Sequence, residues 1–256
     1  MELTAFAGLP GALAGAPENA GPALLTYYDD ATGERTDLSA AELAGWAART
    51  AALLRDGCGL GEGDRAAVLL PPHWQTAAVL LGAWSAQVAV SFRLAATAGL
   101  PALGPGADEP LDVTFVSAKR LDDWLENVPE ARHRFVLGLA PYGAALPEVP
   151  EGYRDFVAEV RRHPERPAAA PPIRHTAAAS VDGTTYRQWG GLARELADRL
   201  DLRAGDRLLV DAAEHEHPVK WLLAPLSAGA SVVLCANLDR SSLASRVAAE
   251  GVTRVL

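Results

Sequence analysis

The 256-residue chain has few of the side chains on which covalent and redox chemistry most often depend. Its two cysteines, Cys58 and Cys235, cannot form a disulfide framework, and neither lies in a metal-ligand spacing. Lys119 and Lys220 are the only lysines, although Lys and Arg together number 23. These counts exclude a cysteine-stapled secreted scaffold, and we expect a reduced, cytoplasmic setting.

Aromatic residues, positive charge and long apolar runs are also scarce. Aromatics make up 6% of the chain, so a core of Ala, Leu and Val is expected. The net charge of −9 argues against nucleic acid or an anionic membrane as a partner, because phosphate groups are bound by basic surfaces. The apolar stretches 66–90 and 221–235 are broken by residues such as Pro71 and Pro225, so neither is expected to span a membrane. The first 16 residues contain no basic residue and make a poor signal peptide.

What the chain does contain is an internal repeat. The tripeptide Gly63–Arg65 recurs as Gly205–Arg207, 142 positions later, with identical letters. The same offset, without a gap, relates Leu60 to Leu202, Val68 to Val210, His73 to His215, Ala86 to Ala228 and Val90 to Val232. A shared register over this length predicts two copies of one structural unit.

Each copy has the pattern of helix, strand, helix and strand. Ser39 with Glu42, and Thr185 with Gln188, have the spacing of a capping box at the start of a helix. The short apolar runs after the Gly-Asp-Arg turns are typical of buried strands. Alternating strands and helices predict an α/β fold with mainly parallel sheets flanked by helices, arranged as two packed lobes.

The remaining segments complete this domain organisation. Their patterns predict strands at Val113–Val116, Arg134–Leu139 and Val252–Leu256, and helices at Ala118–Asn127, Tyr153–Arg162 and Asp239–Glu250. Prolines and alanines mark 163–172 as a linker. We therefore predict a first lobe with an N-terminal hairpin at 1–162 and a second lobe at 173–256.

These motifs resemble the front part of the large domain of acyl-adenylate-forming (AMP-binding) enzymes. The hairpin 25–36, Gly63–Arg65 and the exit Ala86–Val90 resemble the family's first lobe. Gly205–Arg207, the histidine-bearing loop Glu214–Pro218 and Ser227–Ala230 resemble its second lobe. The resemblance covers roughly 25–256 and is greatest to short AMP-binding-like proteins without an assigned activity. It implies the two pseudo-repeated lobes that the internal repeat also predicts.

The chain departs from this family where ATP phosphates would bind. The family's loop has the form T/S-S-G-T-T-G-x-P-K-G, and its amides and lysine surround the phosphates. The nearest match, 181–190, keeps Gly183, Thr184 and Thr185 but has Trp189 in place of the lysine and places Asp182 among the phosphates. A turn before a capped helix, as at 36–42, accounts for the same residues.

Four ligand-binding candidates follow from the resemblance: Gly183, Thr184, Thr185 and His215, the last because it lies near the family's substrate-side histidine or aromatic residue. The tetrapeptide Glu214–His217 also suggests a metal, but no third ligand is evident, and polar residues of a loop explain it. We expect no metal site and no catalytic residue.

The resemblance also places the family's later motifs, with their catalytic lysine, beyond Leu256. We therefore expect a non-catalytic AMP-binding-like protein, a binding or scaffold module without a cofactor, whose partner is an unknown protein or a second copy. The alternative is half of a split acyl-adenylate or acyl-CoA ligase completed by a partner chain, and only then would ATP or AMP bind. A stand-alone ligase with unorthodox phosphate binding is a third hypothesis.

Overall fold

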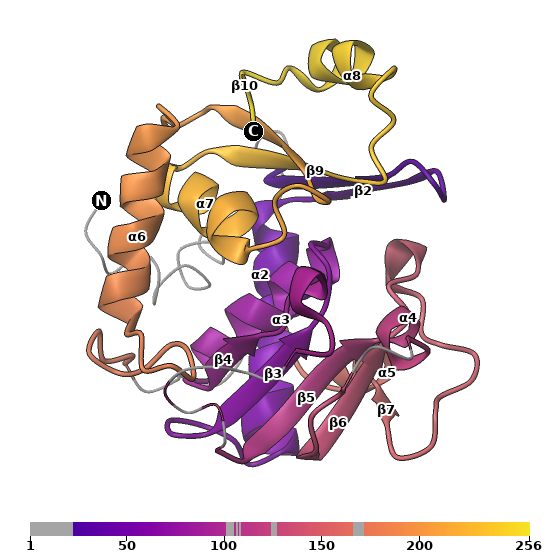
Figure 1. Ribbon diagram of the computed structural model, residues 1–256, viewed down its shortest axis with the longest axis vertical. Coiled ribbons are helices and arrows are strands. Elements are labelled where there is room, and N and C mark those ends of the chain that lie inside the picture. The colour runs from indigo at the N-terminus through magenta and orange to yellow at the C-terminus, as the bar shows by residue number, and fades with distance from the viewer. Residues whose placement is uncertain (1–22, 101–104, 106, 108, 124–126, 166–171) are drawn as a thin grey trace.

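The computed structural model describes residues 23–100, 105, 107, 109–123, 127–165 and 172–256. Within these residues the chain forms two five-stranded sheets with helices between and around them (Figure 1). The strands are β1 (Leu25–Asp29), β2 (Glu34–Leu38), β3 (Arg65–Leu69), β4 (Ala89–Phe92), β5 (Leu111–Ser117), β6 (Ala131–Leu137), β7 (Arg154–Asp155), β8 (Arg207–Asp211), β9 (Ser231–Ala236) and β10 (Arg254–Val255). The helices are α2 (Ala40–Ala52), α3 (Trp74–Ser85), α4 (Ala118–Leu121), α5 (Phe156–Val160), α6 (Tyr186–Arg199), α7 (Ala224–Ala228) and α8 (Leu243–Glu250).

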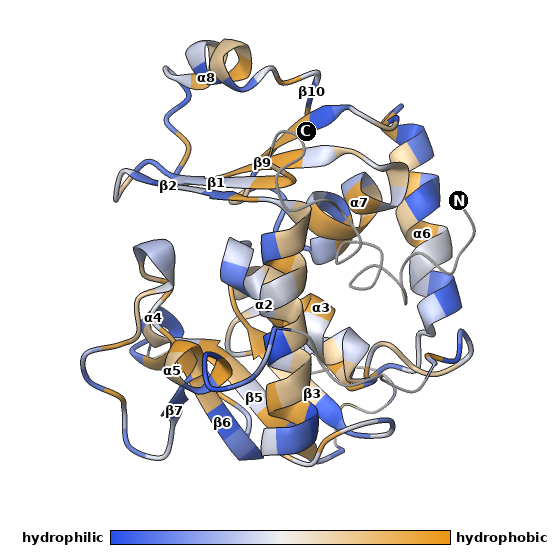
Figure 2. Ribbon diagram, turned by 180° about the vertical axis from the view of Figure 1, so that it is seen from behind, coloured by the Kyte–Doolittle hydropathy of each residue, from blue (hydrophilic) through white to orange (hydrophobic). Residues whose placement is uncertain are grey.

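The first sheet has the strand order β4-β3-β5-β6-β7, and all of its pairings are parallel. Its central strands are buried on both faces, which explains their continuous apolar sequences. Figure 2 shows β3 as mainly hydrophobic. A single buried cluster joins this sheet to the second one through α2, α3, α6 and α7, so the two lobes share a core.

The second sheet has the order β10-β8-β9-β1-β2, with only β1 and β2 antiparallel. The N-terminal hairpin therefore belongs to the sheet of the second lobe, and its assignment to the first lobe was wrong. Leu25, Thr26 and Tyr27 are all buried. The backbone N–H and C=O groups of a buried strand need hydrogen-bond partners along both edges. Strand β9 supplies the second edge of β1 although it lies about 200 residues away in the chain.

The internal repeat corresponds to a repeated backbone geometry. Asp64 Oδ2 accepts a hydrogen bond from Gly61 N (2.7 Å), and Asp206 Oδ2 accepts one from Arg203 N (2.8 Å). The carbonyl oxygen of Asp64 then receives Ala89 N (2.9 Å), and that of Asp206 receives Ser231 N (2.8 Å). Both predicted capping boxes are present at the starts of α2 and α6. The aspartates thus close the turn that aligns the two parallel strands of each copy.

Two predicted helices differ most in extent from the observed elements. The helix predicted at 118–127 is observed as α4 over Ala118–Leu121, and residues 124–126 lie outside the described part of the chain. The segment predicted as one helix from 153 to 162 begins with β7 and continues as α5. Most of the predicted linker, 166–171, also lies outside the described residues, so the domain boundary there stays a prediction.

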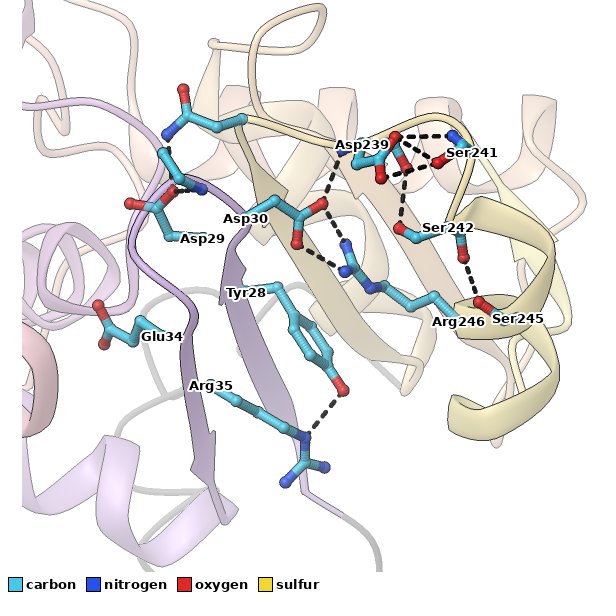
Figure 3. A network of polar contacts seen from close by, with 12 residues as sticks. Tyr28, Asp29, Asp30, Glu34, Arg35, Asp239, Ser241, Ser242, Ser245 and Arg246 are labelled. Carbon is cyan, nitrogen blue, oxygen red and sulfur yellow. Dashed lines mark hydrogen bonds and ion pairs between the residues drawn. The ribbon is translucent and has the colours of Figure 1, made fainter.

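Helix α8 is attached to the second sheet largely by charge. None of its residues is fully buried, although Leu243 and Val247 contact the apolar outer face of β8 and β9. The guanidinium of Arg246 pairs with Asp30 (2.6 Å) and lies over the ring of Tyr28, 4.3 Å from its centroid (Figure 3). Glu250 pairs with Arg207 (2.6 Å) from the end of the helix.

Of the helices in the described part of the chain, none is both long and apolar enough to cross a bilayer.

Candidate functional site

A pocket of about 650 Å³ lies at the carboxyl end of β4, between the first sheet and the loops of the second lobe. This volume is within the range of small-molecule sites, and ligands of open α/β sheets bind outside the carboxyl ends of the strands. Both lobes line the pocket, the first with Phe92, Arg93, Leu94 and Arg120, and the second with Asp182 and His217.

The turn that resembles a phosphate loop reaches this pocket because it extends the first sheet. Val90 N donates to Ala179 O (3.0 Å), and Val181 N donates to Val90 O (3.2 Å), in a parallel bridge between Val90 and Ser180. This bridge places Ser180, Val181 and Asp182 on the pocket wall. The edge of β4 is thereby covered by a segment from the other lobe.

The amides of the predicted ligand-binding loop are already hydrogen-bonded within the chain. Gly183 N donates to Ser180 O (3.0 Å), and Thr184 N donates to Asp182 Oδ1 (3.0 Å). Thr185 N donates to Gln188 Oε1 (2.8 Å), as part of the capping box. The loop therefore uses on itself the donors that a phosphate would need, and it is the preceding residues, 180–182, that line the pocket.

Asp182 carries its negative charge at this turn. Ser180 Oγ donates to Asp182 Oδ1 at 2.7 Å, on the same oxygen that receives Thr184 N. Burial raises the pKa of Asp182, but the hydrogen bonds from Thr184 and Ser180 lower it by more than burial raises it. The pKa is therefore below its usual value. At neutral pH Asp182 is therefore an ionised carboxylate on the pocket wall.

Aromatic rings form another part of the pocket wall. The ring of His217 stacks on Trp189, with centroids 5.6 Å apart, and contacts Phe92 at 5.1 Å. Its Nδ1 accepts a hydrogen bond from Val219 N (3.2 Å), which leaves the proton of the neutral ring on Nε2. Burial, followed by the charge of Lys220, lowers the pKa of His217. The neutral ring thus offers one N–H donor beside an apolar surface.

His217, and not the predicted His215, is the histidine of the pocket. His215 is half-buried, and its Nδ1 lies 3.3 Å from Lys220 Nζ. In the first copy His73 caps α3 by accepting Gln75 N (3.0 Å), and the 142-residue offset equates His73 with His215. The equivalent hydrogen bond is made two residues later, where His217 Nδ1 accepts Val219 N at the start of a π-helical turn, Val219–Leu223. Pro218 was the available signal, since proline favours the first turn of a helix.

The tetrapeptide Glu214–His217 sends its side chains to separate partners. Glu214 pairs with Arg240, while Glu216 accepts hydrogen bonds from the amides of Ala95 and Ala96. Within the described residues, no cluster of three or more His, Cys, Asp or Glu side chains could hold a metal ion. The tetrapeptide instead joins the second lobe to the wall of the pocket.

Comparison with solved structures identifies the fold. A Brucella canis acyl-CoA synthetase superimposes on the whole of this chain with a TM-score of 0.70 at 18% identity, over 47% of the synthetase. The acetoacetyl-CoA synthetase of Streptomyces lividans gives 0.69 at 19% identity, over 42% of its length. The chain therefore spans about half the length of these synthetases, and it has the two-sheet α/β fold of the part that it matches.

Comparison of sequences identifies the family. No family model matches the chain. A TIGR03089 family protein of Mycobacterium tuberculosis (strain ATCC 25618 / H37Rv) is 40% identical over 237 residues, which cover 91% of this chain and 90% of that protein. Because identity at this level extends over nearly the full length of both proteins, the chain belongs to the TIGR03089 family.

Proposed function

We propose that this protein is a non-catalytic AMP-binding-like module that serves in binding or as a scaffold. The observation that carries the proposal is the self-bonded loop 182–185, in which Asp182 accepts the amide of Thr184 and the next amide is held by Gln188. An ATP phosphate would have to break these hydrogen bonds and approach an ionised carboxylate. Both effects disfavour phosphate binding.

The two lysines and Arg120 support the same proposal, and Arg93 is a further basic residue of the pocket lining. Adenylate formation depends on cations that stabilise the charge of the transferring phosphate. Lys119 is exposed on α4, and Lys220 lies beside His215 outside the pocket lining. Arg120 lines the pocket, but its guanidinium donates to the carbonyl oxygens of Arg93 and Leu94. These contacts give Arg120 a structural role in holding the wall.

The pocket retains the features of a binding site for a small molecule without phosphates. Phe92 and His217 provide flat ring surfaces, and His217 provides an N–H donor. Ligand sites are typically apolar cavities with a few placed polar groups. A binding role is therefore compatible with the loss of the phosphate loop.

Isothermal titration calorimetry tests this function. The purified protein would be titrated with ATP and magnesium, with AMP, and with a non-hydrolysable acyl-adenylate mimic. We expect no heat from ATP or AMP, because the loop amides are engaged, and no release of pyrophosphate on incubation with ATP and carboxylic acids. A full-length acyl-CoA synthetase in the same buffer is the positive control.

Micromolar binding of the adenylate mimic would contradict the proposal. It would favour the split-ligase hypothesis, in which a partner chain supplies the remaining motifs. Absence of heat with all three compounds would leave a scaffold role, and size-exclusion chromatography would then distinguish a monomer from a homodimer.

A further inference from the structure

The segment after β4, residues 93–98, forms a wall of the pocket and is held by opposite charges from the two lobes. Its first two carbonyl oxygens, on Arg93 and Leu94, accept hydrogen bonds from Arg120 of the first lobe. Its next two amides, on Ala95 and Ala96, donate to the two carboxylate oxygens of Glu216, with Ala96 N at 3.2 Å from Oε2. Hydrogen bonds to charged groups are the stronger kind, so the first four residues of this wall segment are firmly placed.

The two attachments differ in how easily they can be released. Arg120 is only 8% exposed and belongs to the same lobe as the wall segment. Glu216 is half-buried and belongs to the other lobe. When the half-buried carboxylate of Glu216 breaks its hydrogen bonds, water can replace them. A buried guanidinium that broke its hydrogen bonds would have no water to replace them. Opening at Glu216 is therefore less costly than opening at Arg120.

Release of Glu216 requires only its side chain to rotate. The carbonyl oxygen of Glu216 accepts the indole N–H of Trp221 (3.0 Å), and Trp221 is almost completely buried. The backbone of Glu216 thus stays in place, and so does the adjacent His217, which is stacked on Trp189. The wall segment can swing while the aromatic wall remains.

We propose that Glu216 is a releasable latch between the lobes, which closes the pocket by holding residues 93–98 while Arg120 serves as their fixed anchor. A small ligand would enter when the carboxylate leaves the amides of Ala95 and Ala96, and re-formation of the latch would enclose it. The inference relies on the proposed function for the assignment of this pocket as a ligand site. The latch can still be tested in the ligand-free protein.

Amide hydrogen exchange of the full chain provides that test, in Glu216→Ala, Glu216→Gln and a control, Glu214→Ala. Glu214 belongs to the same loop but pairs with Arg240. We expect exchange at Ala95 and Ala96 to be faster by roughly tenfold or more in Glu216→Ala, since two charge-assisted bonds are lost. Glu216→Gln retains one acceptor oxygen and should give a smaller increase. Glu214→Ala should match the wild type at these amides.

A second measurement reports on access to the pocket. The dye 8-anilinonaphthalene-1-sulfonate should bind Glu216→Ala more strongly than the wild type or Glu214→Ala. Unchanged exchange at Ala95 and Ala96 in both Glu216 variants would overturn the proposal. So would an equal acceleration across both sheets, which would assign Glu216 to overall stability. Micromolar binding of the adenylate mimic, which would contradict the proposed function, would not alter either result, so the latch and the proposed function can fail separately.

Discussion

Gly82→Ala should lower the free energy of unfolding by about 2–3 kcal/mol, although alanine is the better helix former. Gly82 lies where α3 crosses α2. A Cβ atom added there would be 2.4 Å from Thr50 Cβ, 2.6 Å from Thr50 Cγ2 and 2.9 Å from Ala47 O. Thr50 cannot turn away easily, because its Oγ1 donates to Trp46 O (2.9 Å). The helices would have to separate within the shared core. Urea unfolding followed by circular dichroism measures the loss.

Gly191→Ala is the matched control for this prediction. Gly191 also lies inside a helix, α6, but is exposed, and an added Cβ would meet nothing within 4 Å. This substitution should stabilise the protein by about 0.5–1 kcal/mol through helix propensity. If Gly82→Ala proves as stable as the wild type, the close crossing of α2 and α3 is incorrect.

Glu250→Gln should destabilise the protein by about 2 kcal/mol at pH 7 and loosen α8. The side chains of Glu250 and Arg207 are only 9% and 11% exposed, and their ion pair is 2.6 Å long. Burial raises the pKa of Glu250, but hydrogen bonds from Tyr28, Arg207 and Arg35 outweigh it and lower the pKa from 4.5 to about 2. Each unit of pKa shift corresponds to about 1.4 kcal/mol, and partial screening by solvent reduces the total.

The sign of the pH dependence follows from this lowered pKa. The folded state binds the Glu250 proton less readily than the unfolded state, so the stabilisation is complete above pH 4.5. It is lost as the pH falls from 4.5 towards 2. The difference between wild type and Glu250→Gln should therefore shrink over this interval. Urea midpoints at pH 7, 4 and 3 measure it.

Glu195→Gln is the corresponding control, because Glu195 pairs with Arg199 on the exposed face of α6. Exposed pairs of this kind contribute about 0.3–0.5 kcal/mol, so this variant should unfold nearly as the wild type does. If Glu250→Gln lowered the free energy of unfolding by as little as Glu195→Gln does, the role of Glu250 in anchoring α8 would be contradicted.

Much of the local structure could be predicted because its determinants are close together in the chain. The capping boxes at Ser39 and Thr185 and the strands after each Gly-Asp-Arg turn depend on residues within one or two turns of each other. The register of the repeat predicted two copies of one unit, and the alternation of strands and helices within each copy predicted the α/β fold.

Which strands pair and which side chains meet could not be predicted, because these contacts join residues that are distant in the sequence. Which sheet receives β1 is decided by its pairing with β9, and no local pattern encodes a partner 200 residues away. The presence of His217 in the pocket lining could not be read from the repeat, because the repeat equates His73 with His215. The contact of Glu216 with Ala95 and Ala96 likewise requires both lobes to be packed together. Short-range hydrogen bonding and hydrophobic periodicity thus determined the elements, whereas burial in a shared core determined which of them meet and which side chains face the pocket.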